Sequence, residues 1–286
     1  MGDGSFQAPP MTVDDFRKNW RLTLAYDGAD FHGWQIQPDA AATPTVQAAL
    51  AAAIAAVTGE QVLPQGAGRT DAGVHALGQV ASFPLQAAIP PDNLVRALNR
   101  VLPAAILVHS ATPAPPDFHA RHSACGKIYR YCVMRAPKCP PHLARYAVPF
   151  RWPLNVAAMQ AAAQQVVGQH DFTSFAASDP DRSERRGKDA GSMVREIQSS
   201  DWEEMRTDGG LKAGAQNLLV YTVQGNGFLQ HMVRNLVGTF LDVGRGAISP
   251  QAVPGILAAR NRSSAGPTAP ANGLYLVKVL YPETAG

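Results

Sequence analysis

The sequence predicts an α+β fold in which two similar subdomains share one continuous, mostly antiparallel mixed sheet with helices packed on it. Three observations lead to this expectation. Segments with the two-residue period of strands are interleaved with amphipathic helical segments in both halves of the chain. A proline-rich stretch without periodicity separates the halves. The last predicted strand is apolar on both faces, so it belongs in the middle of a sheet or in an interface.

The first half begins with a strand at residues 20–26, where apolar residues alternate with polar ones. A helix is expected at 46–57, because its apolar residues recur on one face and Thr45 is a suitable N-cap. The half continues with a strand at 79–85, a helix at 92–101 and strands at 106–112 and 127–134.

The second half repeats this order loosely. We expect a helix at 155–167, strands at 193–201 and 218–223, helices at 229–243 and 251–259, and a final strand at 274–280. In the final strand, Leu276 is a candidate for lining a pocket.

The expected domain limits follow from these elements. The chain divides into a flexible N-terminal extension at 1–17, an N-terminal subdomain at 18–135, a linker at 136–154 and a C-terminal subdomain at 155–286. Within the last, residues 178–191 carry mixed charges and few apolar side chains, which predicts a mobile surface loop.

The composition of the 286 residues is that of a globular protein, with 46% hydrophobic and 16% charged residues. The N-terminus lacks the apolar core of a secretory signal, and the longest apolar run, 48–57, is about half a membrane span. Three cysteines without a C-x-x-C pair indicate a reducing compartment, so we expect a cytoplasmic protein. The net charge of +3 is compatible with a nucleic-acid partner without demonstrating one.

A glycine-rich turn at residues 66–75 presents a single carboxylate, Asp71, beside Arg69 and Thr70. Glycines let the main chain bend tightly and let another molecule approach it closely. A dinucleotide-binding loop would need a third glycine in place of Asp71 and a helix after it, whereas a strand follows here. Two other interpretations stay open, a polar β-turn between strands and a metal site formed by Asp71 and His75.

The strand at 127–134 contains an aromatic candidate, Tyr129. A tyrosine on one face of a strand is commonly part of the core. A tyrosine offered to an unstacked base supplies both a π-face and a hydroxyl group. The residues alone leave both interpretations open.

The helix at 229–243 contains a basic candidate, Arg234, on a strip that it shares with His231 and Gly238. Gly238 would let another element come close to this strip. Arg234 is therefore either an exposed helix charge or the partner of a carboxylate in a site. Basic residues recur in or beside the motifs described above, at Arg69, Arg121, Lys127, Arg130, Arg195 and Arg234.

Six segments, in this order along the chain, together resemble the TruA-type tRNA pseudouridine synthases. The segments are YDG at 26–28 with GWQ at 33–35, GAGRTDAGVHALGQVASF at 66–83, DFHARHSACGKIYRY at 117–131, DFTSF at 171–175, HMVRN at 231–235 and GLYLV at 273–277. The chain departs from the family pattern in its N-terminal extension, in the 178–191 loop and at His122, where Phe or Tyr is usual. None of these departures touches Asp71.

The resemblance implies an activity and a set of residue roles. Enzymes of this family isomerise uridine at positions 38–40 of the tRNA anticodon stem-loop. By resemblance, Asp71 is the nucleophile and Tyr129 stacks on the target base. Arg69 contacts RNA or flips the nucleotide, and Arg234 is the basic partner that keeps the acid ionised. The family implies a pseudouridine-synthase fold, a homodimer with a basic cleft for tRNA, and no cofactor or catalytic metal.

Two other classes of protein compete with this interpretation. The first is an RNA-binding protein without catalysis, against which the intact Asp71, Arg69 and Tyr129 argue. The second is a metal-dependent hydrolase that uses Asp71 and His75, which would require further ligands.

Overall fold

The computed structural model describes residues 17–37, 43–177, 192–207 and 216–282. The expected loop at 178–191 and residues 1–16 of the expected N-terminal extension lie outside the described residues.

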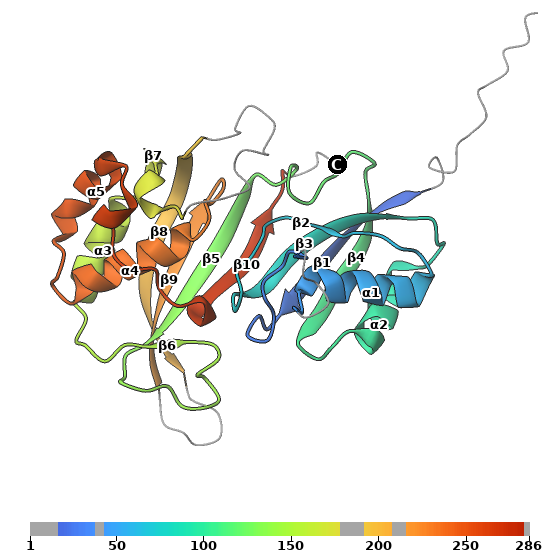
Figure 1. Ribbon diagram of the computed structural model, residues 1–286, viewed down its shortest axis with the longest axis horizontal. Helices are drawn as coiled ribbons and strands as arrows, with labels where there is room; N and C mark the ends of the chain where they lie inside the picture. Colours follow the sequence, from blue (N-terminus) through green and yellow to red (C-terminus); the bar gives the residue numbers. More distant parts are fainter. Residues whose placement is uncertain (1–16, 38–42, 178–191, 208–215, 283–286) are drawn as a thin grey trace, which may run out of the picture.

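The described chain forms one ten-stranded sheet that runs through both halves of the molecule, with the first half at the right of Figure 1. The strand order is β4-β1-β3-β10-β5-β9-β8-β7, with β2 on β3 and β6 on β5. All pairs are antiparallel except β10 with β3 and β5 with β6. The strands are β1 (Lys18–Tyr26), β2 (Gln65–Gly66), β3 (His75–Leu85), β4 (Ile106–Ala114), β5 (Gly126–Met134), β6 (Val148–Pro149), β7 (Gly168–Asp171), β8 (Val194–Thr207), β9 (Gln216–Gly225) and β10 (Leu274–Leu280).

The last strand, β10, joins the two halves. It pairs in parallel with β3 of the first half and antiparallel with β5 (Figure 1). The expectation of a central position for this strand is confirmed, and so is the expected mixed, mostly antiparallel sheet. Since β10 is the only member of the path between β3 and β5, the described sheet is continuous through the C-terminal strand.

Helices pack on each half of the sheet (Figure 1). Thr45 caps α1 as expected, with its hydroxyl oxygen accepting from the Ala48 N–H at 3.3 Å. The α-helices are α1 (Val46–Thr58), α2 (Pro91–Val101), α3 (Val156–Gln164), α4 (Met232–Gly244) and α5 (Val253–Ala259). Short 3₁₀ turns lie at Thr173–Phe175, Pro250–Ala252, Arg262–Ser264 and Ala271–Gly273.

Several expected limits were wrong for local reasons. Helix α4 starts at Met232 rather than 229, because His231 has a left-handed backbone with φ 58° that a helix does not contain. Helix α3 ends at Gln164 rather than 167, and the unexpected strand β7 begins at Gly168, which has φ 100°. Strand β3 starts at His75 rather than 79. The two-residue strands β2 and β6 were not predicted, because segments so short carry no periodicity.

Gly238 lets a distant segment touch the backbone of α4. The chain at Pro267 passes so close that a Cβ atom at Gly238 would collide with the Pro267 carbonyl oxygen. Two residues later, the Ala269 N–H donates to the carbonyl of Arg234 at 3.1 Å. The expected close approach at Gly238 is therefore confirmed, and it fixes the segment before β10 against α4.

The variant Gly238→Ala should be destabilised by about 1–3 kcal/mol, because the added methyl group must push apart two packed backbone segments. Gly255→Ala in α5 is the matched control. Nothing lies within 4 Å of a Cβ atom there, so the change should be neutral or stabilising by up to about 1 kcal/mol. Denaturant unfolding measures both variants, and equal stabilities would contradict the close contact at Gly238.

Candidate functional site

The turn that presents Asp71 is held by the segment that follows β1. The Trp34 N–H donates to the Thr70 carbonyl at 3.0 Å. Gly33 has φ 89°, and a side chain there would collide with the same carbonyl. The turn itself closes with the Val74 N–H donating to the Asp71 carbonyl at 3.1 Å. Asp71 thus does lie in a β-turn, and packing against the backbone of 33–34 fixes its position.

Two cationic or protonatable side chains from the second half of the chain converge on the Asp71 carboxylate. The Arg234 Nη1 lies 3.0 Å and the His231 Nε2 lies 3.3 Å from Asp71 Oδ2. The Arg234 Nε also donates to the Ala269 carbonyl at 2.7 Å, and the side chain is 16% exposed. The interpretation of Arg234 as an exposed helix charge is therefore wrong, because this arginine pairs with a carboxylate.

His231 was not selected as a site residue from the sequence. Its place on one strip with Arg234 was the available signal, since residues three apart on a helix lie on one side. However, His231 has a left-handed backbone and lies just before α4, so the three-residue helical spacing does not predict where its side chain points. The direction of its side chain toward Asp71 could thus be found only in the folded chain.

A cavity of about 220 Å³ lies next to Asp71. The cavity is lined by residues from both halves of the chain: 67–71, Val74, Arg121, Lys127, Tyr129, 228–233 and Leu274. Arg69 and Tyr129 were both predicted as site residues, and the fold brings both to this cavity with Asp71 and the 231–233 segment. Leu276 does not line it; Leu274 does, so the pocket expectation for Leu276 was wrong.

Tyr129 belongs both to the core and to the cavity wall. Its side chain is only 7% exposed, and its ring meets the edge of Phe228 with centroids 5.0 Å apart. Burial raises the pKa of the Tyr129 phenol well above its ordinary value, and nearby Tyr26 and the Asp71 carboxylate act in the same direction. The hydroxyl group therefore stays protonated at neutral pH and can donate a hydrogen bond into the cavity.

Lys127 lies two residues before Tyr129, on the same face of β5, and also lines the cavity. Burial lowers the pKa of this lysine to about 8, and the positive charges of Arg121 and Arg195 act in the same direction. In the sequence, Lys127 stands out only as one of several basic residues near the motifs. Its position on the cavity wall follows from the register of β5.

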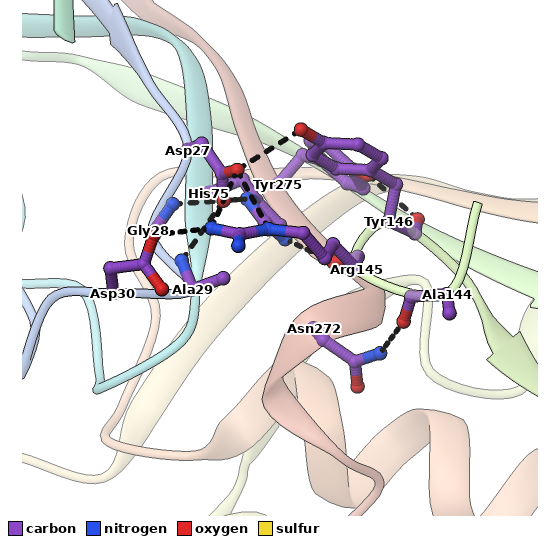
Figure 2. Close-up of polar contacts among 10 residues, drawn as sticks. All are labelled: Asp27, Gly28, Ala29, Asp30, His75, Ala144, Arg145, Tyr146, Asn272 and Tyr275. Carbon is purple, nitrogen blue, oxygen red and sulfur yellow. Dashed lines mark hydrogen bonds and ion pairs between the residues drawn. The ribbon is translucent and has the colours of Figure 1, made fainter. Parts of the chain in front are cut away.

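His75 lies in a polar network with Asp27, Gly28 and Arg145 (Figure 2). Its Nδ1 accepts from the Gly28 N–H at 3.0 Å and lies 3.1 Å from Asp27 Oδ1, while its Nε2 lies 2.9 Å from the Arg145 carbonyl. Burial lowers the pKa of His75, which favours the neutral ring. Arg145 and the Tyr146 hydroxyl donate to Asp27 Oδ2 at 3.1 and 3.0 Å. The paired use of Asp71 and His75 as metal ligands is therefore wrong.

The described residues contain no group of three or more His, Cys, Asp and Glu side chains arranged to hold a metal ion. Among the helices of the described ranges, none has the length and apolar character needed to cross a bilayer.

Comparison with known proteins places the chain in a family. A family model described as tRNA pseudouridine synthase matches residues 23–123 and 162–282. The chain belongs to the tRNA pseudouridine synthases. Relatives named tRNA pseudouridine synthase A support this: the one from Moorella thermoacetica is 45% identical over 91% of this chain and 98% of its own length. The one from Brevibacillus brevis is 42% identical over 92% of this chain and 100% of its own length.

Family membership confirms the resemblance seen in the sequence and the pseudouridine-synthase fold class. Pseudouridine synthases are isomerases that act on uridine, so this chain is an enzyme of the isomerase class with tRNA as its substrate. Family membership therefore favours a tRNA-modifying isomerase over both competing classes, a binding protein without catalysis and a metal-dependent hydrolase.

Asp71 and Arg234 should show a coupling energy of about 0.5–3 kcal/mol in a double-mutant cycle. The cycle uses denaturant unfolding of Asp71→Asn, Arg234→Met and the double variant. Arg234→Met should be the more destabilising single change, because it also removes the bond to Ala269.

The pair Arg245–Asp242 is the control, because it lies at the opposite, C-terminal end of α4 and Arg245 is 45% exposed. Its coupling should be about 0–1 kcal/mol. Additive effects of Asp71→Asn and Arg234→Met, within about 0.3–0.5 kcal/mol, would show that the two side chains do not interact in solution.

Proposed function

We propose that this enzyme converts uridine to pseudouridine at positions 38–40 of the tRNA anticodon stem-loop, with Asp71 as the nucleophile and Tyr129 stacking on the target base. The observation that supports the proposal is the position of the Asp71 carboxylate. It lies on the wall of a base-sized cavity with Tyr129, and Arg234 and His231 hold one of its oxygens. These residues stand in the segments that resemble the family motifs.

The reaction breaks the C1′–N1 bond of uridine, turns the base and joins C5 to C1′. C5 then loses its proton and N1 gains one, so no oxidant, water or group donor is consumed. An ionised carboxylate can begin the reaction by attacking C1′ or by removing a proton from C2′. Arg234 and His231 fit either route, because both hold Asp71 through Oδ2 and Oδ1 has no partner among the described residues.

The detached base must stay in the site while it turns. A volume of about 220 Å³ is below the roughly 300–1,000 Å³ of pockets for drug-sized ligands, which suits a single extruded base. Tyr129 supplies an aromatic wall, and its protonated hydroxyl can donate to a uracil carbonyl. Arg69 lines the same cavity and is proposed to contact the RNA strand beside the extruded uridine.

The remaining parts of the proposal rest on the family resemblance. We propose a cytoplasmic homodimer that binds tRNA in a basic cleft and works without a cofactor or metal. Light scattering of the purified protein measures the oligomeric state. Tritium release from tRNA labelled at uracil C5, followed by mapping of the modified positions, tests the choice of uridines.

Asp71→Asn should abolish pseudouridine formation, because an amide can neither attack C1′ nor remove a proton from C2′. Affinity for tRNA should stay within about tenfold of the parent, since phosphate contacts supply most of it. Asp92→Asn on the exposed side of α2 serves as the control and should keep full turnover. Measurable single-turnover product from the Asp71→Asn enzyme, beyond any trace of parent enzyme in the preparation, would refute the nucleophile assignment.

Tyr129→Leu should still fold, with a lower melting temperature because the ring is part of the core. The folded variant should lose at least about tenfold in turnover, because stacking on a base contributes about 1–3 kcal/mol. Tyr129→Phe keeps the ring and should retain tRNA binding, so that any loss of rate measures the hydroxyl group. The assay is single-turnover tritium release, combined with thermal melting of each variant. If Tyr129→Leu lowers the melting temperature and leaves the rate of the folded enzyme unchanged, the tyrosine is only a core residue.

A further inference from the structure

Lys127 is a cation on the wall of the catalytic cavity to which the proposed reaction gives no role. Its ammonium group and the Tyr129 hydroxyl both lie against Gly68 of the Asp71 turn. A Cβ atom at Gly68 would be 3.6 Å from Lys127 Nζ and 3.7 Å from the Tyr129 hydroxyl oxygen. The ammonium therefore lies beside the place where the target base would stack.

Nothing in the described part of the chain neutralises this ammonium, since Lys127 forms no ion pair or hydrogen bond there. The nearby carboxylate, Asp71, already has Arg234 and His231 on one oxygen. Within the described ranges, the charges that act on Lys127 are those of Arg121 and Arg195, and both repel it.

A partly desolvated cation beside two other cations is costly for the folded protein. This arrangement suits a site that is completed by an anion from outside the chain. Phosphodiester groups are the anions of an RNA substrate at neutral pH, and lysine binds them as a point charge. Uracil oxygens are neutral, so they would leave the charge of Lys127 uncompensated.

We propose that Lys127 binds a phosphodiester group adjoining the target uridine, with Arg121 and Arg195 adding positive potential around it. The bound phosphate would hold the backbone of the extruded nucleotide while its base lies against Tyr129. Lys127 is thus a substrate-binding residue that fixes the nucleotide, rather than a proton carrier, because an arriving phosphate favours the charged ammonium. This inference rests on the proposed function.

The test combines variants of the enzyme with RNAs that lack one phosphate charge. Stem-loop RNAs carry a single uncharged methylphosphonate either 5′ or 3′ of the target uridine, and the unmodified stem-loop is the reference. Single-turnover rates over a range of enzyme concentrations give a half-saturating concentration and a maximal rate. The enzymes are the parent, Lys127→Met, Lys127→Arg and Arg130→Met. Arg130 is the matched control, because it is an exposed cation on the opposite face of β5.

On unmodified RNA, Lys127→Met should raise the half-saturating concentration at least tenfold, Lys127→Arg should restore most of the affinity, and Arg130→Met should change it less than threefold. The salt dependence of binding by Lys127→Met should lose about one unit of log–log slope, as expected for one phosphate contact. One of the two methylphosphonates should weaken binding by the parent enzyme as much as Lys127→Met weakens binding of unmodified RNA. The same methylphosphonate should leave binding by the Lys127→Met enzyme unchanged.

The proposal is overturned if the losses from Lys127→Met and from each methylphosphonate simply multiply. It is also overturned if Lys127→Met lowers the maximal rate with a shifted pH profile and an unchanged half-saturating concentration, which would indicate proton transfer. Product formation by the parent enzyme on unmodified RNA tests the proposed function separately. If the parent makes no pseudouridine, the function fails; if it does and the coupling is missing, only the role of Lys127 fails.

A second measurement, thermal melting without RNA, checks that the ammonium lacks a partner. The pKa of Lys127 in the folded chain, about 8, lies below the ordinary value of 10.5, so its charge opposes folding below pH 8. Lys127→Met should therefore melt at a higher temperature than the parent at pH 7, and the difference should shrink as the pH rises from 8 to 10.5. A lower melting temperature at pH 7 would show that the ammonium has a stabilising partner and would overturn the argument.

Discussion

The pairing of Asp71 with Arg234 is the interaction on which the rest of the site depends, because it joins two segments that are far apart in the sequence. Asp71 comes from the turn before β3, and Arg234 comes from the first turn of α4. The same guanidinium donates to Ala269, just before β10. A partly buried carboxylate is costly unless a cation and hydrogen bonds compensate its charge. The two halves must therefore dock correctly before the site exists.

The central position of β10 makes that docking possible. This strand pairs with β3, which follows the Asp71 turn, and with β5, which carries Lys127 and Tyr129. The register of the sheet thus sets the distance between the acid and the aromatic wall. Close backbone contacts at Gly33 and Gly238 fix the turn and α4 against their neighbours, leaving each little freedom to shift.

The charged side chains near the Asp71 turn form two separate groups, one around His75 and one around the cavity. The His75 network connects β1 and β3 to the 144–146 turn and keeps its own acid, Asp27, paired with Arg145 (Figure 2). Among the described residues that line the cavity, by contrast, Asp71 is the one carboxylate and several side chains are basic. A protein that must receive a polyanion gains from such an excess of positive charge, because the substrate supplies the missing negative charge. Without RNA, these like charges destabilise the folded enzyme, most clearly at Lys127, whose pKa is lowered by burial and by neighbouring arginines.

The sequence by itself determined the order and type of the long elements, since periodicity and capping are local properties that Thr45 and the alternation in β1 express directly. It also determined which turn presents Asp71, and the family motifs identified Tyr129 and Arg234 as its companions. Tertiary structure alone decided that His231 turns toward the acid while His75 joins a different network, and that Leu274 rather than Leu276 lines the cavity. These outcomes depend on strand register and on one left-handed residue, which place side chains from distant segments and leave no local pattern in the chain.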